Sequence, residues 1–459
     1  METLRRCFPS RIRQILDELP TTLDETYERI LSEIPEEKWK HAHHLIQCLV
    51  FSFRPLHIDE LVEVFAIGFD SEMTPDPIQG WRPENTEDAV LSACSSLIDI
   101  VEVGDSPVVQ ISHFSVKEFF TSNQLSTVSS RNVSRYHIAP DPAHKILAQA
   151  SLGTLLELDE HIDKNRLEDY PLAFYAAQCW FKHARFGDVS LSILDSMGQL
   201  FDPGKPHFSA WIWIHDVHRD RRIRSIEDLP ERPPPPKNTP LYYSAACGIR
   251  SLAEHLIAFY PEDVNSQEKS KWGPLRVAVE NGHVDVARLL LEHGAFPNPV
   301  VGRCTLLHHA SRCDDSDDIQ LLIDHGADVD CTDDGDRTPL HLASANGCVR
   351  AMQKLLLYGA DVNKHMRHGW TPLHRASTHG SPEGIRLLFR HGANIDEKDG
   401  IGWTALHWAS FKRRPEITQA LLECGADVYA RDKSNRTPFQ LALIWKHHDV
   451  AQLLLEYGE

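Results

Sequence analysis

Thr338-Pro339-Leu340-His341-Leu342-Ala343 recurs along the C-terminal half of the chain, and this recurrence determines its architecture. Copies at a constant step of 33 residues are Thr371–Ala376, Thr404–Ala409, Thr437–Ala442 and, upstream, Thr305–Ala310. Looser copies begin at Gly273 and Thr239. A second motif runs in phase, as HGA at His293, HGAD at His325, YGAD at Tyr358, HGAN at His391 and CGAD at Cys424. A fixed period of this length predicts an array of stacked units.

Each unit is expected to contain two short helices followed by a turn. Thr is a good N-cap, and Pro loses no hydrogen bond at the first helical position, so a helix should begin at Thr338-Pro339. A second helix follows, for example Ala351–Leu357, and the Gly after it supplies a left-handed C-cap. One such unit cannot bury its apolar face alone, so neighbouring units must stack.

The period and the signature resemble those of the ankyrin repeat. The resemblance covers residues 239–459 and predicts an α-solenoid of about seven repeats, the first two of them degenerate. The sequence departs from the family pattern at Arg312–Asp318, where an acidic run replaces a helix end, and at Lys412–Pro415, where a basic run replaces a Gly. Because ankyrin arrays bind other proteins, a protein partner is the expected ligand.

The resemblance also implies which positions contact a partner. In the hairpins these are Asp334, Arg337, Arg367, His368, Trp370, Trp403, Lys433, Ser434 and Arg436. At the ends of the first helices they are Asn346, Thr378, His379, Phe411 and Lys412. Trp and Arg dominate many interfaces, so one hypothesis makes Trp370, Trp403 and Phe411 the anchor of the partner site. An amphipathic Trp ring can equally pack on the next hairpin, and the sequence leaves both alternatives open.

Four histidines occupy the same position in successive repeats: His308, His341, His374 and His407. No carboxylate stands at ligand spacing beside them, so a zinc site is not predicted. In a stacked array they should form a buried row that braces the turns through hydrogen bonds.

A run of four prolines lies within Asp228–Pro240 and predicts an extended linker at 228–238. The chain before it reads as mostly helical. Thr22 and Glu25 form a capping box, and apolar stripes predict helices that follow Leu23, Trp39 and Ile58.

A small β-hairpin is expected after these three helices. Its strands are Leu97–Val103 and Val108–Ile111, separated by a Gly-Asp-Ser-Pro turn. A helix at Ser115–Phe120 and further helices within 142–196 should follow. Three helices with a hairpin make a winged-helix-like plan, so the fold class expected for the chain is mainly α.

Four segments of this half are similar to the stretch that follows the NACHT nucleotide-binding domain in fungal NACHT–ankyrin proteins. They are LPTTLDETYERIL at 19–31, RPLHIDEL at 54–61, HFSVKEF at 113–119 and YAAQCW at 175–180. The resemblance is to the winged-helix domain described in proteins of the GPI inositol-deacylase-like type. It implies a NACHT-type tail at 1–35, a winged-helix-like domain at 36–125 and a helical domain at 126–227.

In that family the NACHT module binds nucleotide, the winged helix relays the switch and the repeats sense a partner. The resemblance therefore implies a relay or docking module of a NLR-like signal-transduction system, and assembly with NACHT-type proteins. Met1 falls inside the tail region, so the chain is expected to start after the nucleotide-binding domain. A first alternative is that the chain is the C-terminal part of a longer NTPase switch. A weaker alternative is an adaptor that delivers substrates to a modifying enzyme.

No catalytic, cofactor-binding or metal-binding residues are predicted. The nearest approach to a phosphate loop, Gly198–Pro206, has the wrong spacing and a Pro where Ser or Thr must bind magnesium. His41, His43 and His44 lack companion ligands and are expected on a solvated edge, titrating near neutral pH. The chain is therefore expected to be non-enzymatic.

Composition limits the partners further. The 459 residues carry a net charge of −19, which does not favour nucleic-acid binding. No apolar run approaches the ~20 residues of a membrane helix, so no membrane partner is expected. The ten cysteines lack a CxxC pair, as is typical of an intracellular protein. A cytoplasmic location is expected, with the short cluster Arg219–Arg224 as a weak nuclear address.

Overall fold

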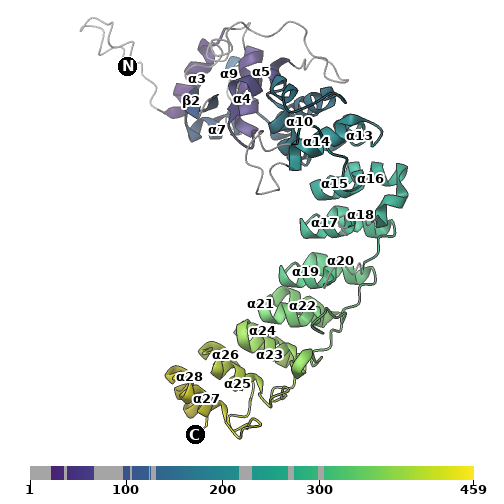
Figure 1. Ribbon diagram of the computed structural model, residues 1–459. Helices are drawn as coiled ribbons and strands as arrows, with labels where there is room; N and C mark the ends of the chain where they lie inside the picture. Colours follow the sequence, from purple (N-terminus) through teal and green to yellow (C-terminus); the bar gives the residue numbers. More distant parts are fainter. Residues whose placement is uncertain are drawn as a thin grey trace, which may run out of the picture. The chain divides into compact units, whose positions relative to one another are not determined.

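The computed structural model describes residues 22–35, 39–66, 97–103, 106–122, 125, 131–216, 230–266, 273–297 and 304–458. These residues form two compact units, Met1–Pro236 and Lys237–Glu459 (Figure 1). Both are mainly helical, and the only sheet among the described residues has three strands. The expected fold class is therefore confirmed. Most of the tail at 1–35 and the cluster Arg219–Arg224 lie outside the described residues.

The first part of the N-terminal unit combines short helices with the small sheet. Its elements are α3 (Leu23–Glu33), α4 (Trp39–Phe51), β1 (Leu56–His57), α5 (Ile58–Ala66), β2 (Ile98–Val103), β3 (Ser106–Ile111) and α7 (Phe114–Thr121). The strands pair antiparallel in the order β1-β3-β2. The hairpin and the capping box of Thr22 and Glu25 are confirmed, whereas the two-residue strand β1 was not expected.

The rest of this unit is helical. Its elements are α9 (Arg131–Ser134), α10 (Pro140–Glu157), η2 (Arg166–Asp169), α11 (Ala173–Ala184), α12 (Val189–Ser192), α13 (Leu194–Leu200) and α14 (Pro206–Asp216). Helix α10 packs against α11, and α11 against α14, around the buried rings of Trp180, Trp211 and Phe201. The indole of Trp211 donates a hydrogen bond to the carbonyl of Ala177, so its polar atom is satisfied inside this core.

Two further interpretations of this half can be compared with the structure. The segment Gly198–Pro206 connects α13 to α14, so a helix precedes it rather than the strand that a phosphate loop follows. The expectation for His43 was wrong, because its ring lies against Trp39 and Tyr136 instead of at a solvated edge. Burial, together with the neighbouring His44, lowers the pKa of His43 to about 4. His43 therefore stays neutral near pH 7.

The described part of the C-terminal unit contains seven helix pairs. The first helices of the pairs are α15 (Pro240–Cys247), α17 (Pro274–Glu280), α19 (Leu306–Arg312), α21 (Pro339–Asn346), α23 (Pro372–His379), α25 (Ala405–Phe411) and α27 (Pro438–Ile444). The second helices are α16 (Arg250–Phe259), α18 (Val284–Glu292), α20 (Ser316–Asp324), α22 (Val349–Leu357), α24 (Pro382–Arg390), α26 (Pro415–Glu423) and α28 (His448–Glu456). First helices pack on first helices and second on second, so the unit has two layers. Figure 1 shows the pairs stacked in sequence order.

The repeated motif forms each unit as its residue types require. Thr338 caps α21, Pro339 opens it, and Gly359 after α22 has a φ of 85°. His341 completes the cap from the other side, because its Nδ1 accepts a hydrogen bond from the Thr338 N–H at 3.2 Å. Its Nε2 donates to the carbonyl of Trp370 in the next repeat at 3.2 Å. The predicted row of buried, bracing histidines is therefore confirmed, and each of them links two neighbouring repeats.

Candidate protein-binding face of the repeats

The inner face, as we name it here, is the surface formed by the hairpin tips and the first helices of the repeats. In three of four successive repeats an aspartate organises the hairpin: Asp333, Asp399 and Asp432. In each case Oδ1 accepts hydrogen bonds from the backbone N–H groups two and four residues later. The carboxylate therefore fixes the hairpin from within.

The second carboxylate oxygen binds a side chain. Oδ2 of Asp333 accepts from Arg337 Nε at 2.8 Å, and Oδ2 of Asp432 accepts from Arg436 Nε at 2.9 Å. Burial opposes ionisation of Asp333, but these hydrogen bonds hold its pKa below the usual value. Oδ2 of Asp399 has no such Arg and accepts instead from Trp408 Nε1 at 2.9 Å. Trp408 stands nine residues after Asp399, on the following first helix.

The hairpin at 366–370 lacks the aspartate. Met366 occupies the position, 33 residues before Asp399, and its thioether cannot replace a carboxylate. Arg375 stands nine residues after Met366, in the register of Trp408. Its Nε is buried without a hydrogen-bond partner. Among the residues that the structure describes, none forms an ion pair with Arg375, although the charge of Asp333 attracts it. The centre of the Trp370 ring lies 5.9 Å from the guanidinium carbon.

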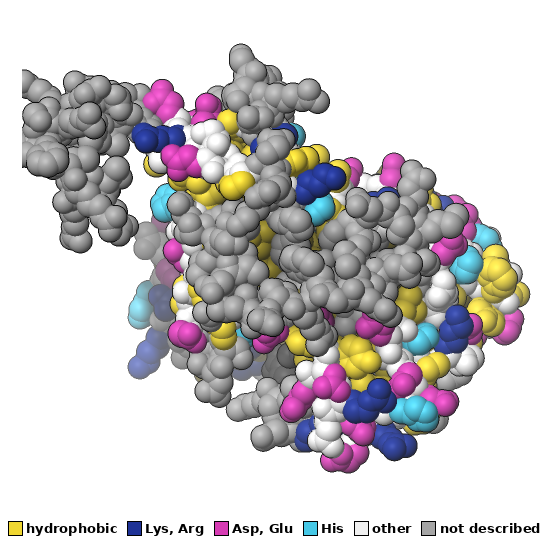
Figure 2. Space-filling model, turned by 90° about the horizontal axis from the view of Figure 1, so that it is seen from above, with side chains coloured by type: hydrophobic (Ala, Val, Ile, Leu, Met, Phe, Trp, Pro, Cys, Tyr) yellow, Lys and Arg dark blue, Asp and Glu magenta, His cyan; other side chains and the backbone are white. Residues whose placement is uncertain are grey.

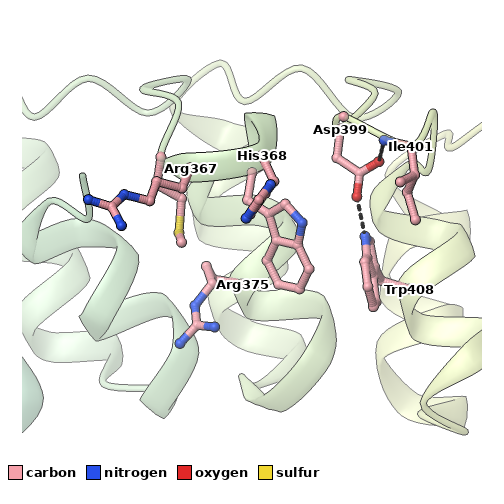
Figure 3. A pocket seen from close by; sticks show the side chains of 9 residues that line it. Arg367, His368, Arg375, Asp399, Ile401 and Trp408 are labelled. Atoms are coloured by element: carbon pink, nitrogen blue, oxygen red, sulfur yellow. Dashed lines mark hydrogen bonds between the residues drawn. The ribbon is translucent and has the colours of Figure 1, made fainter. Parts of the chain in front are cut away.

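These side chains surround a hollow of about 450 Å³ on the inner face. Figure 3 shows Arg367 and His368 above Arg375 on one side of it. Asp399, Ile401 and Trp408 lie on the other side, with the hydrogen bond between Asp399 and Trp408 drawn. Met366, Trp370 and Gly400 complete the lining. The hollow thus combines indole and aliphatic walls with one cation that has no carboxylate partner.

An aromatic cluster continues from the hollow along the inner face. The Trp408 ring lies between two others, 4.4 Å from Trp370 and 4.6 Å from Trp403 between ring centroids. Phe411 contacts both Trp403 and Trp408 and reaches the Trp445 ring of the last repeat at 5.1 Å. Trp445 is 54% exposed. Large rings that are partly open to solvent are typical of protein-binding surfaces.

The surroundings of Arg375 are basic. His379 and Lys412 are exposed, and Arg414 donates through Nε to the Thr378 carbonyl. Burial and the charge of Arg337 lower the pKa of Arg375, and burial and the charge of Arg375 lower that of His379. The charge of Asp333 acts in the opposite direction on Arg375 but does not offset burial and the charge of Arg337.

The structure distributes the expected contact residues over three kinds of place. The exposed ones are Asp334, Asn346, Arg367, His368, His379, Lys412, Lys433 and Ser434. The half-buried ones are Arg337, Trp370, Phe411 and Arg436. Trp403 and Thr378 are only 8% and 1% exposed, and Trp403 Nε1 donates to Asp432 Oδ2 of the next hairpin. These two side chains therefore offer little surface to a partner.

Sequence reasoning missed Arg375, Trp408 and Met366. The first two fill the variable position of the TPLHxA signature, where Leu342 and Leu441 stand in other repeats. A large aromatic or charged residue at that position was the available signal. Met366 carried another signal, because it interrupts the repeated hairpin aspartate.

Other site types find little support. Among the coloured side chains in Figure 2, acidic and basic ones are intermixed. Among the described residues, no group of three or more His, Cys, Asp or Glu side chains could hold a metal ion. No helix that the structure describes is both long and apolar enough to cross a membrane.

Comparison with known proteins agrees with the repeat geometry. A family model described as ankyrin repeats (three copies) matches residues 227–300, 307–399 and 385–459. The C-terminal part of the chain is therefore an ankyrin-repeat region. Among curated proteins, the chain is similar to the azaphilone pigments biosynthesis cluster protein L of Monascus ruber, with 32% identity over 294 residues. The match covers 61% of this chain and 61% of that relative.

Proposed function

We propose that the ankyrin-repeat unit binds a protein partner through its inner face, and that the N-terminal unit is the relay or docking module of a NACHT-type signalling system. The observation that carries the first part is the cluster of Trp370, Trp408, Phe411 and Trp445 beside an unpaired Arg375. Trp and Arg are the residues most often dominant in protein interfaces. Ankyrin repeats themselves indicate a protein–protein interaction role.

The full chain, tagged and expressed in its own organism, should capture a defined partner after cross-linking. Replacing Trp408 or Phe411 by Ala should weaken the purified complex by about 30-fold or more, the size expected for an interface anchor. Gln419→Ala is the matched control, because Gln419 is exposed on the second helix α26. The proposal would be contradicted if the Trp408 and Phe411 variants bound the partner as tightly as the unchanged chain while circular dichroism showed that both were folded.

The relay role is supported by the four N-terminal segments at 19–31, 54–61, 113–119 and 175–180. A second candidate, the C-terminal part of a longer NTPase switch, is supported by the same segments. Mapping the 5′ end of the transcript distinguishes the two. An in-frame extension that encodes a phosphate loop favours the switch, whereas a start at Met1 favours a separate module.

The name of the relative assigns that protein to a pigment biosynthesis cluster and states no reaction. For this chain we propose a non-enzymatic role in the cytoplasm. Imaging of the chain fused to a fluorescent protein tests the location, and a concentrated nuclear signal would contradict it.

A further inference from the structure

We propose that the hollow between the hairpins at 366–370 and 399–403 binds the carboxylate of a Glu or Asp side chain from an acidic segment of the protein partner. This inference rests on the proposed function and specifies its partner. The central residue is Arg375, which takes the same position in its repeat as Trp408 takes in the next.

The comparison between neighbouring repeats shows what Arg375 lacks. Trp408 donates its N–H to Asp399, nine residues earlier. The residue nine positions before Arg375 is Met366, which offers no acceptor oxygen. The guanidinium carbon lies 5.9 Å from the centre of the Trp370 ring, and Nε is buried and has no hydrogen-bond partner. The guanidinium therefore has no acceptor for its Nε within the chain, and a carboxylate of a partner would form a charge-assisted hydrogen bond with the guanidinium group.

The other carboxylates near the hollow already have partners and do not pair with Arg375. Asp333 is bound by Arg337, and Asp336 is bound by Arg367 at 3.3 Å. Asp399 accepts hydrogen bonds from two backbone N–H groups and from Trp408, so its oxygens are occupied. Within the described residues, Arg375 is thus the arginine of this hollow that forms no ion pair with a carboxylate, whereas Arg367 pairs with Asp336.

The side chains that line the hollow favour a carboxylate over other anions. Asp399 also lines the hollow, and its negative charge opposes a doubly charged phosphate, whereas one guanidinium balances one carboxylate. Trp370, Trp408 and the 51% exposed Ile401 provide apolar surface for the methylene groups of an acidic side chain and for its neighbours. The positive charges of Lys412 and Arg414 nearby favour further acidic residues in the same segment.

The net charge of the whole chain restricts where an acidic peptide can bind. With a net charge of −19, most of the surface does not attract an acidic peptide. An acidic segment is therefore expected to bind where local basic groups and an apolar hollow coincide, which is at Arg375.

A random peptide library displayed on phage, selected against the full chain, tests the inference. The selected peptides should share an Asp or Glu, and changing it to Asn or Gln should weaken binding about 10-fold or more, as for a charge-assisted hydrogen bond. The Arg375→Gln variant should bind the selected peptides more weakly by the same factor. Arg390→Gln removes a charge from the exposed end of α24 in the same repeat and should bind like the unchanged chain.

Met366→Asp separates lost binding from lost folding. The new carboxylate would stand in the register of Asp399 and pair with Arg375 from within the chain. This variant should bind the acidic peptides more weakly by a similar factor, whereas its melting temperature should not fall. Retained binding in both Arg375→Gln and Met366→Asp would overturn the inference.

The outcomes also separate the two proposals. Peptides that share no acidic residue but are lost with Trp408→Ala would overturn the carboxylate site and support protein binding by the inner face. A selection that yields no binding peptide would contradict both.

Discussion

At the scale of single residues, His374 connects two repeats through its two ring nitrogens. Nδ1 accepts from the Thr371 N–H at 3.1 Å, and Nε2 donates to the Trp403 carbonyl of the next repeat at 3.0 Å. The last repeat carries Gln440 instead, which still accepts from the Thr437 N–H. Gln thus keeps the cap without a link to a following repeat.

This comparison predicts different costs for two variants of His374. His374→Leu leaves two buried backbone groups unpaired and should lower the free energy of unfolding by about 2–4 kcal/mol. His374→Gln keeps the cap and should lose about half as much. Urea titration of the full chain measures both values. Equal losses in the two variants would show that the cap bond contributes nothing, and an unchanged stability of His374→Gln would show the same for the cross-repeat bond.

Asp318 is a residue whose charge destabilises the fold. It is buried in the first turn of α20, and its Oδ1 has no hydrogen-bond partner within the described residues. Burial, followed by the charge of Asp315, raises its pKa from 3.8 to about 7. Between these values the folded state holds the proton more tightly than the unfolded state. Stability therefore falls as the pH rises from 3.8 to 7, and the loss is complete above 7.

Asp318→Asn should remove this loss. At pH 8 the free energy of unfolding should rise by about 1–3 kcal/mol, because no ionised carboxylate is then buried. At pH 4 the gain should be close to zero. Asp317→Asn is the matched control, since Asp317 is exposed in the same turn and favours the helix N-terminus. Thermal melts at both pH values provide the measurement, and a gain that does not depend on pH would contradict the assignment.

At the scale of elements, the histidine row makes the repeat stack sensitive to acid. Burial lowers the pKa of His341 from 6.5 to about 4, and it lowers those of His308, His374 and His407 as well. A protonated ring would direct an N–H at the N–H of the capping Thr. The unfolded state therefore binds more protons between pH 6.5 and 4. Stability is complete above pH 6.5 and is lost as the pH falls toward 4.

The expected size of this effect follows from the shift. Lowering the pH from 7.5 to 5 should cost about 2 kcal/mol for His341 alone, because one pKa unit corresponds to 1.36 kcal/mol. Urea midpoints of the ankyrin helices at the two pH values measure it. A His341→Gln variant should have a flatter pH profile than the unchanged chain. If the variant and the unchanged chain had identical pH profiles, the pH dependence could not come from the buried histidine at position 341.

The elements also show how far the sequence can be interpreted. The helix pairs were predictable because caps, prolines and apolar positions repeat every 33 residues and depend on local chemistry. Strand β1 was not, because two residues give no alternating pattern and pair only through contact with β3. The buried position of Trp403 depends on Asp432, 29 residues later. The missing aspartate at Met366 can be read from the 33-residue register, but that Met366, Arg375 and Trp408 line one hollow is shown only by the packing of neighbouring repeats.

At the scale of the whole molecule, each of the two compact units has its own buried core. Trp180, Trp211 and Phe201 fill the core of the N-terminal unit, whereas each repeat of the C-terminal unit packs mainly on its neighbours. Energetic coupling in a repeat array acts between adjacent units. A destabilising substitution should therefore affect stability in one unit without spreading through the chain.

Hydrogen exchange with mass spectrometry tests this independence in the full chain. Trp180→Ala should cost about 3–5 kcal/mol, since it leaves a large cavity, and should speed exchange in α10, α11 and α14. Exchange in α21–α27 should remain unchanged, because those helices depend on the histidine row and on their neighbours. His374→Leu should have the converse effect, centred on α23 and α25. Faster exchange across both units from either substitution would show that the chain unfolds as one cooperative body.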